Sequence, residues 1–447
     1  MEQYRVKTLT APVDWAVKVP GSKSITNRAL LLAALSDGPV RLEGVLFSDD
    51  TRYFLQALRA LGFDLWEDEK TKNVTVRGCG GLIPKKKAEI YVGSAGTAAR
   101  FLTAMAGFSD GVYTVKASEQ MKRRPMKPLF ELLERAGAAV TYLEREGFLP
   151  VCIRGRDFGK TIGRDASAGM HPQRMELDIS RSTQFLSALL LIGPMVKQGF
   201  SIHITSEKKD GSYIRITRKM LKEFGVTVGF DGENYTIGAN TSCHRETYRI
   251  EPDLSAACYF YAAAALTGGT TVVQNVHYDN SQGDLKFLEV LEQMGCAVED
   301  SETGICVRGP ESGSLHGVTV DMNDFSDQAL TLAAIAPFAD SKVKIANIAH
   351  IRKQESDRLS VIVTELTKLG VSCEESADSV VIYPSMPHAG VVSTYEDHRA
   401  AMAFSLIGLR VEGIVIDNPG CCAKTFAQYF ELLTELCMKK DEENVTV

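Results

Sequence analysis

The stretch VPGSKSITNRALLLAAL, residues 19–35, places a short polar segment in front of an uninterrupted apolar run. This pattern is typical of a buried helix with a polar amino terminus. Ser24 and Arg28 are four residues apart, so both project from one face of the first turns. Capping alone would explain Ser24, but it does not require Lys23 and Arg28. The free N–H groups of a helix start, joined by two cations, favour binding of an anion such as phosphate.

Five more segments begin in the same way, with small or polar residues ahead of an apolar, alanine-rich run. They are SAGTAAR, SRSTQF, PDLSAACYF, FSDQALTLA and EDHRAAMAF. The corresponding positions are 72, 86, 73, 72 and 71 residues apart, at Ser24, Gly96, Ser182, Ser255, Asp327 and His398. Such regular spacing predicts six repeats of roughly seventy residues each.

A second pattern recurs five times between these starts. It is an amphipathic helix that ends in Leu-x-x-x-Gly, followed by a strand, a turn and a second strand. The copies occupy residues 58–78, 133–155, 221–240, 291–309 and 366–383. The patterns together predict an α/β protein made of α+β repeats. Two domains of three repeats are expected, because 447 residues exceed what one hydrophobic core usually organises.

The composition excludes several classes of protein. Hydrophobic residues make up 45% and charged residues 24%, as in ordinary globular proteins. The net charge of −6 argues against a general nucleic-acid binder, although a local basic cavity remains possible. The first residues have no apolar signal-peptide core, and no apolar stretch is long enough to span a bilayer. A cytoplasmic protein is therefore expected, with its ten scattered cysteines reduced and no metal site.

Four further segments concentrate charge beside predicted helices. They are SEQMKRRPMKPL with Arg124, HIRKQESDRL with Glu355 and Arg358, EDHRAAMAF with Arg399, and CCAKTFAQYF with Lys424. Each segment alone is a weak signal, since a charge run is usually a solvated surface. Together they supply several cations for a ligand that carries several negative charges.

The charged segments and the helix starts resemble one known family in their order and spacing. PGSKSITNRAL, AGTAAR, KRRPM, STQF, SDQALTLA, QESDRL, DHRAAMAFSL and AKTF are similar to the motifs of the EPSP synthases, from end to end. The resemblance implies two inverse α/β domains, each of three similar βαβαββ-type units, with the active site in the cleft between the domains. It implies a discontinuous first domain, residues 1–20 plus 252–447, and an inserted second domain, residues 21–251.

The resemblance also implies a reaction. Members of the family transfer the enolpyruvyl group of phosphoenolpyruvate to the 5-hydroxyl of shikimate 3-phosphate through a tetrahedral intermediate, on the route to chorismate and the aromatic amino acids. The implied partners are these two small molecules, without nucleic acid or membrane, and a monomer is expected. No cofactor and no metal are expected, because fixed cations can stabilise the developing charge.

The site residues follow from the matching motifs. The resemblance implies that shikimate 3-phosphate is bound by Lys23, Ser24, Arg28, Ser182, Thr183, Tyr213, Asp327, His350 and Gln354. It implies that phosphoenolpyruvate is bound by Lys23, Gly96, Arg124, Gln184, Arg358, Arg399 and Lys424. The implied catalytic residues are Asp327 as the base for the hydroxyl, Glu355 as the group that exchanges the methyl proton, and Lys23 as the proton donor to the departing phosphate.

Several positions depart from the family pattern. Asp210 stands where a serine is usual, so either Asp210 or the nearby Ser212 takes that role. Gln354 stands where a lysine is usual, with Lys353 one place earlier, and either residue could contact the substrate. His350 replaces a common asparagine.

Two alternative functions fit part of the sequence. The related UDP-N-acetylglucosamine 1-carboxyvinyltransferases have a cysteine in the loop before their Arg-Pro, and the corresponding loop KASEQMKRRP has none. An inactive protein that only binds a phosphorylated metabolite would not need both Asp327 and Glu355 beside the cations.

Overall fold

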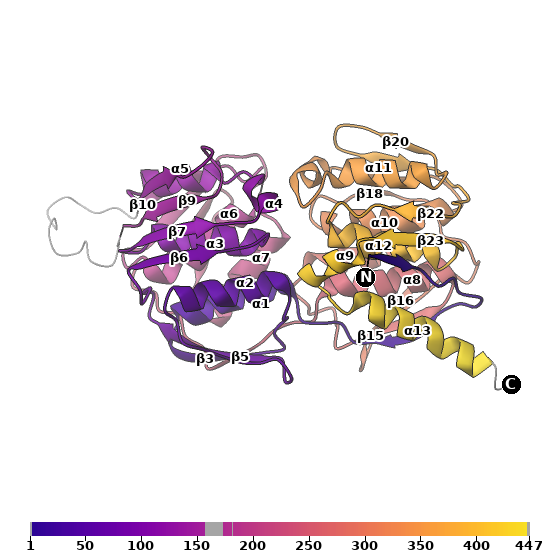
Figure 1. Cartoon of the computed structure of the whole chain (residues 1–447), viewed down its shortest axis with the longest axis horizontal. Helices are drawn as coiled ribbons and strands as arrows, with labels where there is room; N and C mark the ends of the chain where they lie inside the picture. The colour runs from indigo at the N-terminus through magenta and orange to yellow at the C-terminus, as the bar shows by residue number, and fades with distance from the viewer. Residues whose placement is uncertain (1, 157–172, 181, 445–447) are drawn as a thin grey trace, which may run out of the picture. The chain divides into compact units, whose positions relative to one another are not determined.

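The computed structural model describes residues 2–156, 173–180 and 182–444. The chain divides into two compact units (Figure 1). Unit 1 consists of Met1–Pro20 and Pro252–Val447, and unit 2 of Gly21–Glu251. Ser22 N donates to Glu251 O at 2.8 Å, which ties the two ends of unit 2 together. Asp253 N donates to Pro20 O at 2.8 Å and joins the two pieces of unit 1.

Unit 2 contains three four-stranded sheets, one in each repeat. The first repeat consists of β14 (Thr247–Arg249), α1 (Lys23–Leu35), β3 (Asp37–Glu43), α2 (Asp49–Ala60), β4 (Leu65–Asp68) and β5 (Asn73–Cys79). The second consists of β6 (Lys87–Tyr91), α3 (Gly96–Gly107), β7 (Val112–Lys116), α4 (Glu119–Lys122), α5 (Lys127–Arg135), β8 (Ala139–Tyr142) and β9 (Val151–Arg154). The third consists of β10 (Gln173–Leu177), α6 (Gln184–Leu191), η2 (Gly193–Met195), β11 (Phe200–Ile204), α7 (Ser212–Glu223), β12 (Val228–Phe230) and β13 (Asn234–Ile237).

Unit 1 repeats the plan, with two four-stranded sheets and one three-stranded sheet in its described residues. Its first repeat consists of β2 (Asp14–Val17), α8 (Leu254–Thr267), β15 (Thr270–Gln274), η3 (Gly283–Leu285), α9 (Lys286–Gln293), β16 (Ala297–Ser301) and β17 (Gly304–Arg308). The second consists of β18 (Thr319–Asp321), η4 (Ser326–Gln328), α10 (Ala329–Ile335), η5 (Ala336–Phe338), β19 (Val343–Ala346), η6 (Ala349–Lys353), α11 (Arg358–Lys368), β20 (Cys373–Glu375) and β21 (Val380–Ile382). The third consists of β22 (Gly390–Val392), α12 (His398–Gly408), β23 (Ile414–Asp417), η7 (Pro419–Lys424) and the N-terminal β1 (Gln3–Arg5), and α13 (Tyr429–Asn444) follows.

Each four-stranded sheet has the same mixed pairing. The first strand runs parallel to the second, the second pairs antiparallel with the fourth, and the third and fourth form a hairpin, as in β6, β7, β8 and β9. The amphipathic helix before each hairpin ends at a glycine with positive φ, which a left-handed helix terminus favours. These are the five glycines of the Leu-x-x-x-Gly pattern, Gly62, Gly137, Gly225, Gly295 and Gly370, with φ of 93°, 98°, 86°, 97° and 85°.

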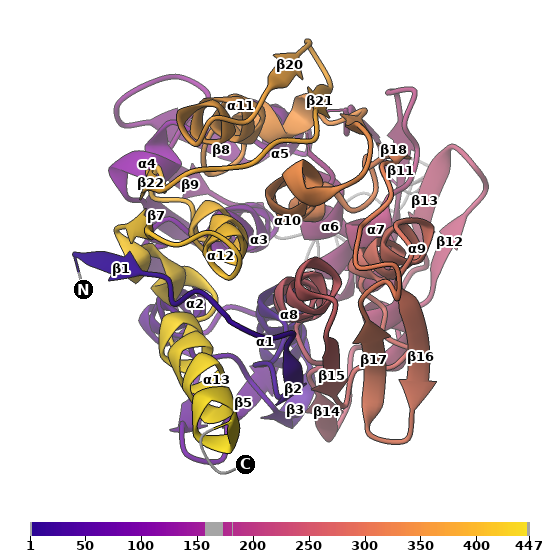
Figure 2. The same cartoon turned by 90° about the vertical axis from the view of Figure 1, so that its right-hand side faces the viewer.

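The first helix of every repeat is buried on nearly all sides, as its apolar sequence requires. In unit 2 these helices are α1, α3 and α6, and in unit 1 they are α8, α10 and α12. Within each unit the three helices pack against one another, and Figures 1 and 2 show α8, α10 and α12 side by side. Equivalent polar residues at the starts of these helices are thereby brought together, although they are about seventy residues apart in sequence.

Candidate active site

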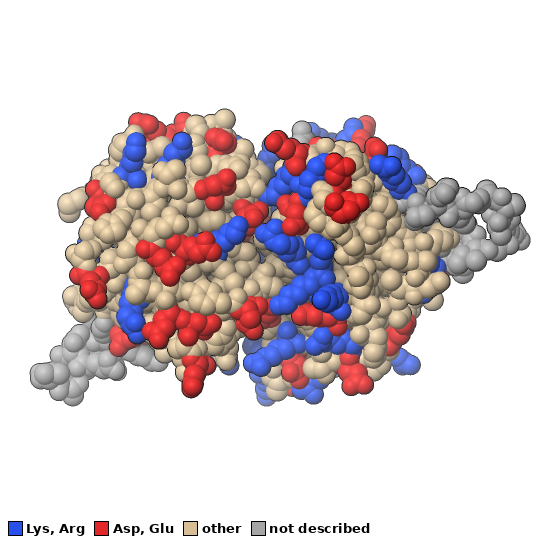
Figure 3. All heavy atoms as spheres, turned by 180° about the vertical axis from the view of Figure 1, so that it is seen from behind, with Lys and Arg blue, Asp and Glu red and all other residues tan. Residues whose placement is uncertain are grey.

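Basic side chains are not spread evenly over the surface. On unit 2, at the right in Figure 3, many Lys and Arg side chains lie near one another, with some Asp and Glu side chains among them. The chain has 50 Lys and Arg against 56 Asp and Glu, so this concentration is local. A local concentration of cations provides a region that attracts anionic ligands even on an acidic protein.

In unit 2, Lys23 is the first residue of α1 and is mostly buried. Its Nζ lies 3.4 Å from Oδ2 of Asp50, whose side chain is 1% exposed. The preceding residue, Ser22, makes no side-chain hydrogen bond to the helix start. The N–H groups of the first turn of α1 are therefore not capped by that hydroxyl, and Lys23 adds a positive charge beside them.

Arg28, one turn further along α1, is 1% exposed. Its Nε donates to Thr217 Oγ1 at 2.8 Å and its Nη1 to the Ser24 carbonyl at 2.9 Å. The guanidinium also lies over the rings of Phe101 and Tyr213, at 5.3 and 5.6 Å from their centres. Among the described residues no carboxylate pairs with it, and burial lowers the pKa of Arg28 to about 10. Arg28 is thus a buried cation that hydroxyls, carbonyls and rings solvate but do not neutralise.

Gly96 begins α3 and is packed against two arginines. A Cβ at this position would lie 2.9 Å from Nη1 of both Arg100 and Arg124. Arg100 Nη1 donates to the Gly96 carbonyl at 2.9 Å. Any side chain here would displace a guanidinium, so the glycine permits close approach of Arg124 to the helix start.

The start of α6 holds Ser182, Thr183 and Gln184. Ser182 Oγ accepts a hydrogen bond from Gln184 N at 3.3 Å, which satisfies one N–H of the first turn. The loop before α7 lies against Thr183, because a Cβ at Gly211 would be 3.4 Å from Thr183 Cγ2 and 3.5 Å from Lys208 Cε. Gly211 thus lies close to both Thr183 and Lys208, a lysine that no sequence pattern singled out.

Asp210, the acid at a position where serine is usual, is turned toward other partners. Its Oδ2 accepts from Arg215 Nη1 at 3.0 Å and its Oδ1 from Tyr235 Oη at 3.1 Å. Burial and the negative charge of Asp210 raise the pKa of Tyr235, so its hydroxyl remains a donor. An anion that approaches this loop therefore meets a carboxylate already bound to a cation.

In unit 1, Arg358 opens α11 and binds three carboxylates. Its Nε donates to Asp397 Oδ2 at 2.8 Å, its Nη1 to Asp327 Oδ1 at 2.8 Å and its Nη2 to Glu355 Oε2 at 3.2 Å. Burial by itself would lower the pKa of Arg358, but the charges of Asp397, Glu355 and Asp327 raise it above the usual value. Arg358 therefore stays charged and holds the two predicted catalytic acids, Asp327 and Glu355, on one guanidinium.

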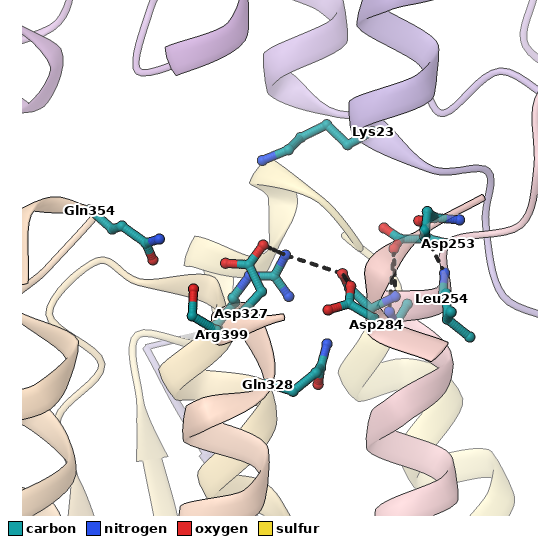
Figure 4. A network of polar contacts seen from close by, with 12 residues as sticks. Lys23, Asp253, Leu254, Asp284, Asp327, Gln328, Gln354 and Arg399 are labelled. Atoms are coloured by element: carbon teal, nitrogen blue, oxygen red, sulfur yellow. Dashed lines mark hydrogen bonds and ion pairs between the residues drawn. The ribbon is translucent and has the colours of Figure 1, made fainter. Parts of the chain in front are cut away.

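Two more cations complete this cluster. Arg399, at the start of α12, donates from Nη2 to Asp327 Oδ2 at 3.0 Å, and Figure 4 shows the two side chains together. Lys424 Nζ lies 3.3 Å from Glu355 Oε1. Each of the two predicted catalytic acids is therefore held by Arg358 and by one further cation.

Asp284, which no sequence pattern singled out, belongs to the same network (Figure 4). Its buried carboxylate is hydrogen-bonded to the Ser255 hydroxyl, and Ser255 Oγ accepts from Arg399 Nη2 at 3.3 Å. Burial, followed by the negative charge of Asp327, raises the pKa of Asp284 to about 7. The only signal in the sequence was its place near the start of a predicted helix, where aspartate is an ordinary capping residue.

Two residues before α11 that differ from the family pattern, His350 and Gln354, contact other polar side chains. His350 Nε2 and Ser326 Oγ are 2.7 Å apart. Gln354 Oε1 accepts a hydrogen bond from Arg358 Nη1, whereas Lys353 is exposed. Because the oxygen of Gln354 is turned to Arg358, its amide NH2 group points away as a potential donor.

No group of three or more His, Cys, Asp or Glu side chains among the described residues is arranged to hold a metal ion. Of the helices that the structure describes, none has both the length and the apolar character needed to cross a bilayer.

The family model for EPSP synthase (3-phosphoshikimate 1-carboxyvinyltransferase) matches residues 8–433 of this chain. A 3-phosphoshikimate 1-carboxyvinyltransferase of Trichormus variabilis is 43% identical over 431 residues, which cover 96% of this chain and 98% of the relative. One of Yersinia pestis is 40% identical over 433 residues, which cover 95% of this chain and 97% of the relative.

Solved structures share the fold. An EPSP synthase of Acinetobacter baumannii superposes with a TM-score of 0.78 at 24% identity, over 98% of both chains. The enolpyruvyl transferase NikO of Streptomyces tendae gives a TM-score of 0.76 at 18% identity, over 97% of both chains. These similarities confirm the predicted fold of repeated α/β units in two domains.

Proposed function

The chain belongs to the EPSP synthase family, and from this premise we propose which of its residues carry each part of the reaction. The enzyme transfers the enolpyruvyl group of phosphoenolpyruvate to the 5-hydroxyl of shikimate 3-phosphate and releases phosphate, a step of the shikimate pathway. Each substrate carries a phosphate and a carboxylate. The site therefore needs several cations whose charge is available to a ligand.

Arg28 supports an assignment of the unit 2 groups to shikimate 3-phosphate. A buried guanidinium that no carboxylate of the described residues neutralises keeps its full charge for a substrate anion. The helix starts of α1 and α6 add N–H groups and hydroxyls that can bind phosphate oxygens. We assign to this substrate Lys23, Ser24, Arg28, Ser182, Thr183, Tyr213, Asp327, His350 and Gln354.

Phosphoenolpyruvate, the second substrate, requires both the planar guanidinium of arginine and the compact ammonium of lysine. Arg358 and Arg399 offer the fork geometry that pairs with carboxylate or phosphate, and Lys424 adds a compact charge. Gly96 allows Arg124 to lie close to the start of α3. We assign to phosphoenolpyruvate Lys23, Gly96, Arg124, Gln184, Arg358, Arg399 and Lys424.

The chemistry requires an acid and a base at neighbouring carbons. Glu355 gives a proton to the methylene carbon of phosphoenolpyruvate, and the 5-hydroxyl oxygen bonds to the adjacent carbon while Asp327 takes the hydroxyl proton. In the second half, a methyl proton leaves to Glu355 as the bond between carbon and the phosphate oxygen breaks. Lys23 gives a proton to the departing phosphate. The two guanidiniums on Asp327 keep it ionised, as a base must be at the start.

The observation that carries this assignment is that one guanidinium, Arg358, holds both Asp327 and Glu355. Release of phosphate by the purified protein tests the function. Phosphate should appear with both substrates together and with neither alone, and it should persist in the presence of a metal chelator. Activity that the chelator abolishes and added metal restores would contradict the proposed role of the fixed cations.

We further propose a monomer that works in the cytoplasm. All proposed site residues come from one chain, and both substrates are phosphorylated metabolites of the cell interior. Light scattering of the eluting peak in size-exclusion chromatography measures the oligomeric state. A mass close to 48.9 kDa is expected.

A further inference from the structure

Two adjacent residues directly before Asp397 and α12, Tyr395 and Glu396, have a left-handed backbone, with φ of 54° and 56°. This conformation is unfavourable for residues with a side chain. The other non-glycine residues with positive φ in the described chain are isolated, and most of them are asparagine, which tolerates it best. A pair of strained residues beside a functional site persists only where the surroundings hold it.

The side chain that holds this turn is Glu365, which is fully buried in α11. Its Oε1 accepts a hydrogen bond from Tyr395 Oη at 2.6 Å, and its Oε2 accepts one from Ser393 N at 3.0 Å. Lys368 Nζ, at 2.7 Å, neutralises the carboxylate. Burial, together with the hydrogen bond to Glu365, raises the pKa of Tyr395 to about 12, so the hydroxyl remains a donor at neutral pH.

The same helix also holds the residue that follows the turn. Arg358 and Glu365 are seven residues apart in α11, which is close to two full turns, so both lie on one face. Arg358 binds the Asp397 carboxylate through Nε at 2.8 Å and Nη2 at 3.2 Å. Asp397 in turn accepts from Arg399 N at 3.0 Å and so sets the start of α12. Helix α11 therefore binds the chain before the left-handed pair, through Glu365 and Ser393 N, and after it, through Arg358 and Asp397.

We propose that Glu365 and Tyr395 are positioning residues for Arg399. They hold the left-handed turn and thereby fix the Arg399 guanidinium relative to Arg358 and Asp327. A guanidinium fork pairs well with a carboxylate or phosphate only when its orientation is fixed. A loosened turn should therefore weaken the binding of phosphoenolpyruvate more than that of shikimate 3-phosphate. The inference rests on the proposed role of Arg399 in binding phosphoenolpyruvate.

The first test is Tyr395→Phe, which removes one hydroxyl and keeps the ring. We expect the KM for phosphoenolpyruvate to rise by about five- to twentyfold, as for the loss of one hydrogen bond to a charged group, with kcat and the KM for shikimate 3-phosphate within about twofold. Tyr383→Phe is the matched control. Tyr383 Oη donates to Glu374 Oε1 at 2.9 Å in the same unit but in an exposed place, and no kinetic change is expected.

Glu365→Gln and the double variant Glu365→Gln with Tyr395→Phe test whether Glu365 and Tyr395 act through their mutual hydrogen bond. Glu365→Gln leaves one acceptor oxygen for two donors, Tyr395 Oη and Ser393 N, and Tyr395→Phe removes one of these donors. Both changes therefore weaken the same contact, so the double variant should be little worse than the more impaired single variant. Fully additive effects, or an unchanged KM for phosphoenolpyruvate in Tyr395→Phe, would overturn the inference. A parallel loss of kcat, both KM values and the melting temperature would also overturn it, because that pattern indicates general destabilisation.

Arg399→Ala separates this inference from the proposed function. If Arg399→Ala leaves the KM for phosphoenolpyruvate unchanged, the assignment of Arg399 to this substrate fails. If Arg399→Ala raises that KM and Tyr395→Phe does not, the assignment stands and the positioning role is wrong.

Discussion

Arg28 in unit 2 and Arg358 in unit 1 are equally buried, each 1% exposed, but their surroundings are opposite. Arg28 is bound by hydroxyls, carbonyls and two aromatic faces, and burial lowers its pKa to about 10. Arg358 is bound by three carboxylates, whose charges raise its pKa despite burial. Arg28 is therefore a cation that no carboxylate of the described residues pairs with, whereas Arg358 is shared among three carboxylates of the protein.

The difference separates two tasks that an enzyme acting on anions has to perform. A cation that binds a substrate phosphate is most useful when no internal carboxylate competes for it. An acid that moves protons is most useful when a neighbouring cation fixes its position and its charge state. We infer that Arg28 serves substrate binding alone, whereas Arg358 also fixes the two acids that move protons, and the following experiments probe that difference.

The largest expected effect is on turnover in unit 1. Asp327→Asn and Glu355→Gln remove the proposed proton carriers and keep their size, so each should lower kcat by about two to four orders of magnitude. Binding of shikimate 3-phosphate, followed by calorimetry, should remain measurable in both variants. Turnover close to that of the wild type in either variant would remove that residue from the proposed chemistry.

The second effect is on the free energy of unfolding, which should respond differently to the loss of Arg358 and to the loss of Arg28. Arg358→Met leaves three carboxylates without their shared cation, which should lower the free energy of unfolding by about 3–5 kcal/mol in urea denaturation. Arg28→Met removes a buried charge that no carboxylate of the described chain balances. Its free energy of unfolding should stay within about 1 kcal/mol of the wild type or rise, because an uncompensated buried charge is itself costly.

The same pair of variants should differ in binding. Arg28→Met should weaken shikimate 3-phosphate binding by about tenfold or more, as expected for the loss of hydrogen bonds between charged groups. If both substitutions lower the free energy of unfolding equally, or if Arg28→Met leaves the affinity for shikimate 3-phosphate unchanged, the proposed difference between Arg28 and Arg358 is wrong.

A third, smaller effect concerns Asp284, a buried carboxylate of unit 1 whose hydrogen-bond partner is the Ser255 hydroxyl. Its pKa is raised from 3.8 to about 7 in the folded protein. Between these values the folded state keeps a proton that the unfolded chain has released, so stability from this group falls as the pH rises through that range. Asp284→Asn should remove this loss. The difference in melting temperature, variant minus wild type, should therefore increase from pH 4.5 to pH 7.5. A difference that does not change with pH would contradict the raised pKa of Asp284.

The smallest effect tests Gln354, which stands where the family usually has lysine. A neutral hydrogen bond contributes about 0.5–1.5 kcal/mol, so Gln354→Ala should weaken shikimate 3-phosphate binding by about three- to tenfold. Lys353→Met should change it little, because Lys353 is exposed. The reverse result would mean that Lys353, and not Gln354, contacts the substrate.

Local patterns in the sequence predicted the repeats and the helix starts, because apolar runs, polar caps and terminal glycines act over a few residues. The ion-pair network could not be predicted in the same way. Arg358 meets Asp327 and Asp397 across 31 and 39 residues, and nothing local distinguishes these acids from capping residues. Asp284 was overlooked for that reason. The strained pair Tyr395 and Glu396 was also hidden, since neither residue type favours a left-handed turn.

The division of unit 1 into two stretches of chain has a consequence for synthesis on the ribosome. The strands β1 and β2 emerge first, but their partners β23 and β15 lie beyond the whole of unit 2. At about 5–20 residues per second, the ribosome needs on the order of 10 to 50 s to make residues 21–251, and β1 and β2 stay unpaired during that time. Unit 2, whose ends hydrogen-bond to each other, can meanwhile fold as a complete body. The unit that holds Arg28 can thus fold before the unit that holds Asp327 and Glu355 is complete.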